Sequence, residues 1–409
     1  MKTKKFFIFF YQLLIKVKQF KFLKIIFRTK WKFKYPDKKK IIIFDGSENF
    51  IFHNYLERKD FDVLYTRKES INIPILIKSL FCKKYEKFFF NYYYTYIDYV
   101  KPKVIVTYID NDIFFYRLKK YFKNLITIVI QNGHRGEDLF SALREYKKDK
   151  LTVDYIFAFS QIYKKLYLGS LNTNVIVHGS LKNNMFPIKK TEKPKSLLFI
   201  SNLAFNYKYF NFGTRNYKLR KAYTFEEYHK SEAQLIPLIV KSCKKYSLDF
   251  GICGRADINN EYYVKYEYDY YKSLIGTDFK WEYFPTESMN EKFNLIDKFS
   301  SVIFIDSYLG YEAIARKKPV LAITIRDEIF KVISGRNFGF PEILQDKGPF
   351  WTNTFDPEYI KQIIHSVTCM SQSEWEQYCK KYIPKVAEYD FDNKKLFNLI
   401  KEKAELHTN

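Results

Sequence analysis

The stretch that decides the fold of this chain is Asp306-Ser-Tyr-Leu-Gly-Tyr-Glu-Ala-Ile-Ala-Arg-Lys-Lys-Pro319. One apolar run, residues 301–305, precedes it, and a second, residues 320–324, follows it. A buried strand, a tight polar turn, a helix and another buried strand in this order predict one βαβ unit.

The turn of this unit has the features of an anion site. Ser307 is placed to cap the helix, whose first free N–H groups point outward with the positive end of the helix dipole. Such an end binds phosphate. Gly310 would let a ligand approach the backbone, and Glu312 would accept hydrogen bonds from ribose hydroxyls. The alternative interpretation is a plain helix cap, with the glycine and the alanines packed against the sheet.

The pattern resembles the second-domain nucleotide-sugar motif of GT-B glycosyltransferases and of the related sugar 2-epimerases. Further segments extend the resemblance to the surface-carbohydrate (O-antigen) biosynthesis proteins of bacteria, from about residue 40 to about residue 380: residues 101–111, 131–135, 179–184, 338–341 and 350–353. The resemblance implies an α/β fold of the GT-B type, in which two Rossmann-like domains face a cleft.

From residue 40 onward, short apolar runs alternate with longer helical patterns, which predicts parallel sheets covered on both faces. The expected strands are 41–44, 63–65, 104–109, 126–130, 155–159, 175–178, 196–200, 250–253, 281–284, 302–305 and 320–324. The expected helices are 84–100, 114–122, 161–169, 225–246, 261–274, 289–298, 308–316, 357–370, 373–382 and 392–405. Polar residues 189–195 form a natural linker. The predicted parts are a basic segment (1–38), an acceptor-side domain (39–188), a nucleotide-sugar domain (189–375) and C-terminal helices that cross back to the first domain (376–409).

The formal charge of +25 is concentrated at the N-terminus, where residues 1–40 hold fourteen Lys or Arg against the single acid Asp37. The sequence has no zinc-finger spacing, RNP-type run or Arg-rich reading helix, so we do not expect a nucleic-acid partner. Its five cysteines are scattered, which suits a reducing cytoplasm.

The N-terminal segment suggests a membrane surface as a partner. Its apolar run, residues 6–15, is too short to span a bilayer, which needs about 20 residues. In a helix, an apolar stripe from Leu13 to Phe27 would lie beside flanking lysines. This predicts a basic amphipathic helix that holds the protein, through residues 1–35, on the anionic inner face of the cytoplasmic membrane. A helix docked on the protein itself, or a disordered tail, is the alternative.

Two polar clusters follow predicted strands of the first domain. Asp110 or Asp112 could act as general base on an acceptor hydroxyl, although Asp112 also suits a helix N-cap. No histidine or further acid completes a metal site there. In the second cluster, Asn132, Gly133 and Arg135 surround His134, whose pKa near neutrality suits proton transfer; a structural histidine in a loop is the alternative.

Further donor-binding residues are expected in the second domain. The resemblance places a segment such as Gly254-Arg255 next to the donor, where the arginine could pair with phosphate or form only a surface ion pair. Ser201 and Asn202 end the domain's first strand and could contact phosphate or acceptor. Residues 182–184 could line the cleft or cap the linker.

These features predict a glycosyltransferase without metal or cofactor. It would move a sugar from a nucleotide-sugar donor to a growing surface polysaccharide, with a lipid-linked glycan as acceptor. A sugar-nucleotide epimerase of the same fold and a non-catalytic scaffold of the polysaccharide machinery are the alternatives. The chain contains no P-loop, hydrolase nucleophile elbow, HExxH or dinucleotide-binding GxGxxG.

Overall fold

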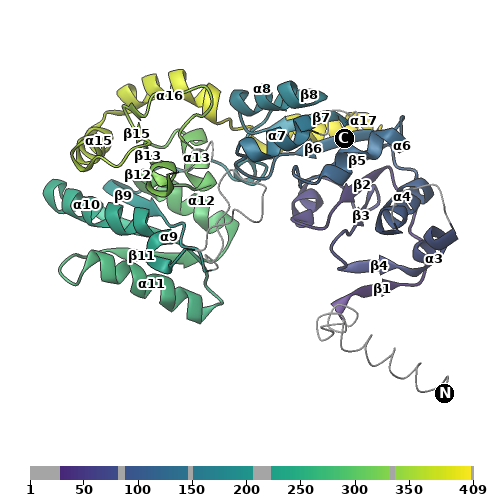
Figure 1. Ribbon diagram of the computed structural model, residues 1–409, viewed down its shortest axis with the longest axis horizontal. Helices are drawn as coiled ribbons and strands as arrows, with labels where there is room; N and C mark the ends of the chain where they lie inside the picture. Colours follow the sequence, from purple (N-terminus) through teal and green to yellow (C-terminus); the bar gives the residue numbers. More distant parts are fainter. Residues whose placement is uncertain (1–27, 82–87, 146–150, 206–222, 332–336, 407–409) are drawn as a thin grey trace, which may run out of the picture. The chain divides into compact units, whose positions relative to one another are not determined.

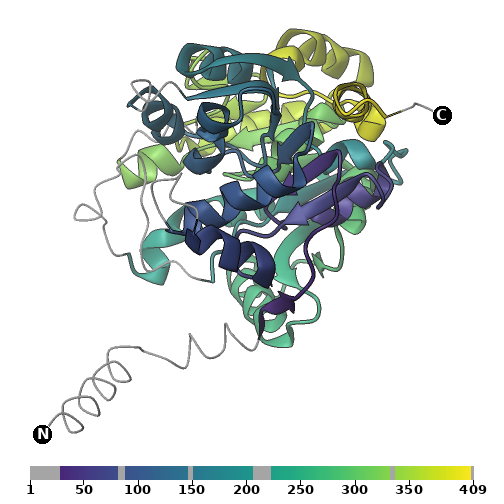
Figure 2. The same cartoon turned by 90° about the vertical axis from the view of Figure 1, so that its right-hand side faces the viewer.

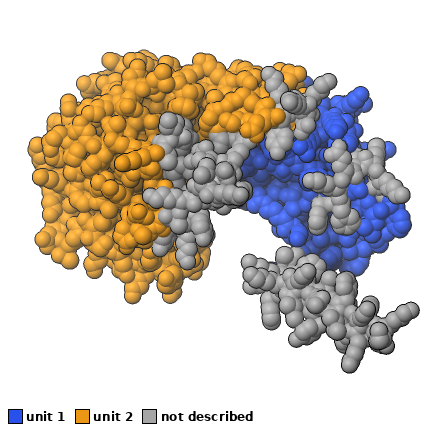
Figure 3. All heavy atoms as spheres, in the orientation of Figure 1, with its two compact units in different colours: residues 1–130, 399–409 blue, residues 131–398 orange. Residues whose placement is uncertain are grey.

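The computed structural model describes residues 28–81, 88–145, 151–205, 223–331 and 337–406. The chain divides into unit 1, residues 1–130 with 399–409, and unit 2, residues 131–398 (Figure 3). The amphipathic stripe that ends at Phe27 lies outside the described residues, so the basic N-terminal helix stays a prediction. Among the residues described, no helix is long and apolar enough to cross a membrane.

Unit 1 is built on four parallel strands in the order β3-β2-β5-β6. The strands are β2 (Ile41–Phe44), β3 (Phe61–Leu64), β5 (Val104–Thr107) and β6 (Ile126–Ile130). Its helices are α3 (Ile73–Phe81), α4 (Phe88–Val100), α5 (Ile113–Tyr116) and α6 (Leu118–Tyr121). A separate two-stranded sheet pairs β1 (Lys30–Lys32) with β4 (Ser70–Asn72). The strands of the larger sheet are rich in Ile and Val and buried along their length, as expected for a covered parallel sheet.

Unit 2 begins with a parallel pair, β7 (Thr152–Ala158) and β8 (Asn172–Val177), accompanied by α7 (Glu137–Glu145) and α8 (Gln161–Ser170). It continues into a seven-stranded sheet of order β11-β10-β9-β12-β13-β15-β14. These strands are β9 (Lys193–Ile200), β10 (Asp249–Asp257), β11 (Glu282–Thr286), β12 (Phe299–Phe304), β13 (Val320–Ile323), β14 (Lys347–Gly348) and β15 (Trp351–Thr352). Only β14 runs antiparallel to its neighbour.

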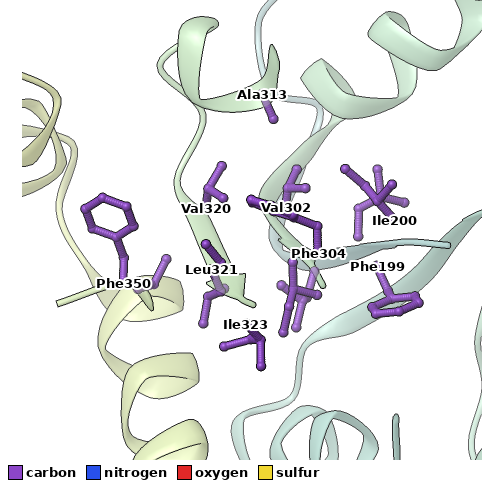
Figure 4. Close-up of a cluster of buried hydrophobic side chains, with 14 of the residues drawn as sticks. Phe199, Ile200, Val302, Phe304, Ala313, Val320, Leu321, Ile323 and Phe350 are labelled. Carbon is purple, nitrogen blue, oxygen red and sulfur yellow. The ribbon is translucent and has the colours of Figure 1, made fainter. Parts of the chain in front are cut away.

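Helices cover both faces of this sheet (Figures 1 and 2). One face carries α10 (Lys230–Tyr246), α11 (Glu261–Ile275) and α15 (Pro357–Cys369), and the other carries α12 (Met289–Lys298) and α13 (Tyr308–Ala315), with α16 (Gln372–Val386) against α13. The remaining helices are α9 (Phe225–Tyr228), α14 (Arg326–Phe330) and α17 (Lys394–Lys403). The core of the sheet is fully buried at Val302, Phe304 and Leu321, where side chains of adjacent strands interlock (Figure 4).

The predicted parallel sheets with helices on both faces are confirmed. Several boundaries differ. Strand β9 starts at Lys193, inside the expected linker, and the expected helices over 114–122 and 225–246 divide at Arg117 and at His229, into α5 with α6 and into α9 with α10. The pairs β1–β4 and β14–β15 were not expected, because strands of two or three residues give no periodic signal. The predicted domain bounds stay a prediction.

Candidate functional site

The seven-stranded sheet of unit 2 reverses its strand order between β9 and β12. From β9 the chain passes through α10 to β10 on one side, whereas from β12 it passes through α13 to β13 on the other side. Open α/β sheets bind ligands at the carboxyl ends of the strands that flank such a point. The two loops meet there, because the Asn202 side-chain amide donates to the Asp306 carbonyl at 2.7 Å. The structure therefore brings Ser201 and Asn202 beside Ser307, and their role toward a donor stays a prediction.

A buried carboxylate on α11 organises this edge of the sheet. Glu267 accepts hydrogen bonds from the Ser201 hydroxyl and from the backbone N–H groups of Arg255 and Ala256, the latter two at 2.8–3.0 Å. The Tyr283 hydroxyl donates to the same carboxylate at 2.8 Å. This carboxylate thus holds the ends of β9 and β10 in place.

The Ser201 hydroxyl has protein partners on both sides. It donates to Glu267 and accepts from the Tyr271 hydroxyl at 2.8 Å and from the Leu203 N–H at 3.2 Å. In this arrangement Ser201 shapes the loop rather than presenting a free hydroxyl. Its role toward a donor stays a prediction.

Arg255 presents its side chain to solvent. The residue is exposed, and its guanidinium donates to the Leu203 carbonyl at 3.3 Å, while its backbone is fixed by Glu267. A fixed backbone with an exposed guanidinium suits recognition of an anion. Gly254 has a packing role, since an added Cβ would overlap the ring of Tyr283.

The start of α13 differs from the expectation in two details. Ser307 occupies the N-cap position, but its side chain makes no capping hydrogen bond; its carbonyl accepts from the Gly310 N–H at 3.0 Å. Gly310 is buried, and a Cβ there would overlap the ring of Phe304. Glycine is therefore required here by helix–sheet packing, which was the alternative interpretation, and its role toward a ligand stays a prediction.

Glu312, on the next turn of α13, is a buried acid with one polar partner from a distant part of the chain. It is 7% exposed, and the Ser180 hydroxyl donates to its carboxyl group. Burial raises the pKa of Glu312 to about 7, against the lowering effects of the Ser180 hydrogen bond and of Lys182, Lys292 and Arg316. Near neutral pH this carboxyl group can therefore both donate and accept a hydrogen bond.

The loop over residues 131–136 lies against α13. The buried Gln131 supports it by donating to the Gly133 carbonyl at 2.9 Å and accepting from the Phe159 N–H at 3.0 Å. The half-buried ring of His134 lies 5.5 Å from the ring of Tyr311, measured between centroids.

The remaining predicted residues of this loop bond to one another. The Arg135 guanidinium donates to the Asn132 side-chain oxygen. The loop is also tied to α8, because the Arg135 N–H donates to the Tyr163 hydroxyl at 3.2 Å. His134 thus lies close to α13, while Gly133 serves as an acceptor for Gln131.

The two aspartates of the first cluster lie in unit 1. Asp112 is the N-cap of α5 and accepts from the Phe114 N–H at 2.9 Å, as the alternative interpretation held. Burial raises the pKa of Asp112, with the neighbouring charge of Asp45 adding to the rise. Asp110 is fully buried, and its carbonyl accepts from the Tyr116 hydroxyl at 2.7 Å.

Asn183 and Asn184 are buried and hydrogen-bonded within unit 2. The Arg316 guanidinium donates to the Asn183 side chain at 3.0 Å and to Asp297, and the Asn184 amide donates to the His178 carbonyl at 2.9 Å. The role of Glu267, like that of Ser180, was not found from sequence. One of three acids among the tyrosines of α11, and a serine between a glycine and a leucine, carry no pattern that separates them from surface residues.

The arrangement suits a phosphorylated sugar ligand. It combines an exposed guanidinium, a helix N-terminus at the strand-order reversal, an acid that can donate or accept, and an imidazole beside the same helix. Within the described ranges, no group of His, Cys, Asp and Glu could hold a metal ion.

Residues 128–404 match the model of a protein family described as "putative O-antigen biosynthesis protein". The chain belongs to this family. Among curated proteins, none has a sequence that matches this chain.

Solved structures match this family member over most of its length. UDP-GlcNAc 2-epimerase from Neisseria meningitidis, bound to UDP-GlcNAc, is 14% identical with a TM-score of 0.50, over 90% of this chain and 100% of that chain. The wall teichoic acid polymerase TagF is 11% identical with a TM-score of 0.50, over 90% of each chain. At such identities the likeness shows the fold alone, and this confirms the predicted GT-B-like fold.

Proposed function

We propose that this protein is a glycosyltransferase that moves a sugar from a nucleotide-sugar donor to a growing surface polysaccharide. The proposal is carried by the strand-order reversal of unit 2, where α13 starts with the buried acid Glu312 on its second turn and where exposed Arg255 stands near the end of the neighbouring strand β10. Membership of an O-antigen biosynthesis family supports a glycan as the product.

In the proposed reaction, the acceptor hydroxyl oxygen forms a bond to the anomeric carbon of the donor, and its proton passes to a general base. The bond from that carbon to the phosphate oxygen breaks, and a nucleotide leaves. Arg255 and the N-terminus of α13 stabilise the charge that develops on the leaving phosphate. Glu312 accepts a hydrogen bond from the nucleotide ribose, exchanging its bond with Ser180 for one to the ligand.

His134 is the base that we favour among Asp110, Asp112 and His134. Its ring is half-buried and lies beside α13 in the same unit, whereas Asp112 is engaged as a helix cap and Asp110 is fully buried. We expect His134→Gln to lower turnover by about 10²-fold or more while nucleotide binding persists, because a general base contributes roughly 10²–10⁴-fold. Unchanged turnover would remove His134 from the reaction.

Nucleotide binding by the full-length protein tests the donor site first. CMP, UDP, GDP, CDP and dTDP are compared in a thermal-shift assay. One of them at about 100 times its Kd should stabilise the fold by about 2.7 kcal/mol. Arg255→Ala should weaken that stabilisation, and Arg144→Ala, which removes an exposed arginine of α7, is the matched control. No shift with any nucleotide, in protein shown to be folded, would favour the scaffold interpretation.

The reaction products distinguish a transferase from an epimerase. The epimerase is the alternative function because the fold matches that of the Neisseria enzyme. Each candidate sugar nucleotide is incubated with the protein and a bacterial lipid extract, and the mixture is followed by proton NMR. Release of nucleotide, with the sugar recovered in the lipid fraction, supports the transferase. An intact sugar nucleotide with an inverted carbon supports the epimerase instead.

We also propose that the protein acts from the cytoplasmic side of the inner membrane on a lipid-linked acceptor. The support is the cluster of fourteen basic residues against one acid in residues 1–40. Flotation with liposomes should be stronger for the full-length protein than for a chain that starts at Lys38. Equal flotation would contradict membrane binding through residues 1–35.

A further inference from the structure

Unit 1 exposes apolar side chains in two short segments. Seven large apolar side chains of its described part are exposed, and six of them lie within residues 31–35 and 77–81. Phe33 and Phe81 are 75% and 81% exposed. Exposed apolar groups that gather in one place mark an interaction surface, whereas scattered ones need no explanation.

The two segments adjoin in the fold. Strand β1 pairs with β4, which leads directly into α3 (Figure 1). The Asn72 side-chain amide donates to the Lys34 carbonyl at 2.7 Å. The rings of Tyr35 and Tyr99 stack at 4.8 Å, and Lys78 of α3 places its Nζ 5.4 Å from the centroid of the same Tyr99 ring. Residues 30–35 and 77–81 therefore form one surface, which we name the β1–α3 face.

The charges on this face are all positive. Lys30, Lys32 and Lys34 alternate with three aromatic residues, Lys78 lies on the exposed side of α3, and neither segment contains an acid. Lysine stems can cover apolar surface while their ammonium groups reach outward. The face thus combines an apolar surface with a positive rim.

A cavity of about 430 Å³ adjoins the strand segment. Its charged lining residues are Lys32, Lys34, Lys39, Arg58, Asp37 and Asp62. Asp62 is engaged internally, since it accepts from the Tyr96 hydroxyl at 2.6 Å and from the Val63 N–H at 2.8 Å. Four cations against two acids leave a net positive charge that favours an anionic group, and the volume suits a lipid headgroup.

We propose that the β1–α3 face docks on an anionic lipid bilayer, with its aromatic and aliphatic side chains at the headgroup boundary and its lysines and cavity on lipid phosphates. Aromatic and basic side chains are both enriched where proteins contact the membrane–water interface. A second copy of the chain would oppose positive charge to positive charge, and a nucleic acid would leave Ile77, Leu80 and Phe81 without a partner. The proposal extends the membrane association proposed above from residues 1–35 to a folded part of unit 1.

The apolar contribution is tested by sedimentation of the full-length protein with phosphatidylcholine vesicles, with and without phosphatidylglycerol. The double variant Leu80→Ser/Phe81→Ser retains residues 1–27 and should bind anionic vesicles at least about tenfold more weakly, since burial of each side chain favours the bound state. The matched control is Leu344→Ser/Tyr262→Ser, at positions of unit 2 that are 76% and 72% exposed. The control should bind as the wild type does.

The charge contribution has its own pair of variants. Lys30→Gln/Lys32→Gln/Lys34→Gln should lower binding about 100-fold, because each lysine near an anionic surface contributes about fivefold. Lys241→Gln/Lys244→Gln/Lys245→Gln removes the same charge from exposed positions of α10 and should have a much smaller effect. Equal losses in the two triple variants, or equal binding to neutral and anionic vesicles, would overturn the proposal.

Two further measurements distinguish this proposal from the proposed reaction and from a protein–protein interface on the same face. Nucleotide release from the donor, measured without vesicles, should be the same for the face variants and the wild type. If no donor is turned over but the face is still needed for vesicle binding, only the proposed reaction fails. If the face variants change self-association in solution and leave vesicle binding intact, the face is a protein interface and the proposal fails.

Discussion

At the scale of the residue, one buried carboxyl group links the site to pH. The folded protein holds the Glu312 proton up to a pKa of about 7, whereas the unfolded chain releases it near the ordinary glutamate pKa of 4.5. Between these pH values the folded state holds more protons, so the free energy of unfolding falls as pH rises. A shift of this size corresponds to about 3 kcal/mol.

Glu312→Gln should remove this dependence. The amide keeps the shape and can still accept from Ser180, but it has no proton to lose. Relative to the wild type, the variant should therefore become more stable by about 3 kcal/mol between pH 4.5 and pH 8. Urea unfolding at several pH values measures this difference, with exposed Glu376→Gln as the control for a lost charge. A constant difference between the Glu312 variant and the wild type would show that this group does not titrate in the range.

At the scale of the element, Gly310 allows α13 to pack closely against the sheet. Replacing glycine by alanine inside a helix ordinarily stabilises it by about 1 kcal/mol. At Gly310 the added methyl group would overlap the buried ring of Phe304, and overpacking a core costs roughly 1–3 kcal/mol. Gly310→Ala should therefore lower the free energy of unfolding.

Gly169→Ala in α8 is the matched control for that substitution. An added Cβ there meets no atom within 4 Å, so this variant should be as stable as the wild type or more stable. The two variants are compared by chemical denaturation. If both stabilise the protein equally, Phe304 yields easily and α13 is not held by this contact.

At the scale of the whole molecule, the C-terminus belongs to the unit that contains the N-terminus. Residues 399–409 group with unit 1. Glu405 pairs with Lys103, and its carbonyl accepts from the Lys40 ammonium at 3.0 Å, so the chain end lies beside the starts of β2 and β5. Ile400 is fully buried.

Ile400→Ala should destabilise unit 1 before unit 2. Loss of a buried isoleucine side chain costs about 2–5 kcal/mol. Hydrogen exchange should accelerate at the amides of β2 more than at those of β9, because local opening follows the stability of each part. Ile239→Ala, at a fully buried position of α10, should produce the reverse pattern. Equal acceleration in both units, for both variants, would show that they open together.

The positions of the buried parallel strands could be predicted from the sequence. Runs such as 41–44 and 126–130, in which Thr127 is the one polar residue, begin and end where β2 and β6 do, because burial on both faces favours apolar side chains along the whole strand. The short strands were harder to predict. The short strand β1 alternates lysine with aromatic residues, which is equally compatible with an exposed loop, and only its pairing with β4 makes it a strand.

For the site, the predicted strand ends located the loops but did not reveal which hydrogen bonds the side chains of these loops make. The predictions of Ser201, Asn202, Arg255 and Ser307 followed from strand boundaries, and these residues do lie at the strand-order reversal or at the end of the strand beside it. The sequence did not indicate that Ser201 is engaged by Glu267, 66 residues away, or that Glu312 bonds to Ser180, 132 residues away. Such pairings depend on which segments the strand order makes neighbours and on the direction of each side chain.

The sequence by itself thus determined the class of fold and the order of its elements, because hydrophobic periodicity is a local property that burial imposes on each element. It also determined the basic N-terminus, since charge is a sum over residues. Only the tertiary structure decided that Gly310 serves packing, that His134 lies beside α13 and that β1 and α3 share one exposed face. Those outcomes depend on contacts between segments far apart in the chain, and no local pattern encodes which segments meet.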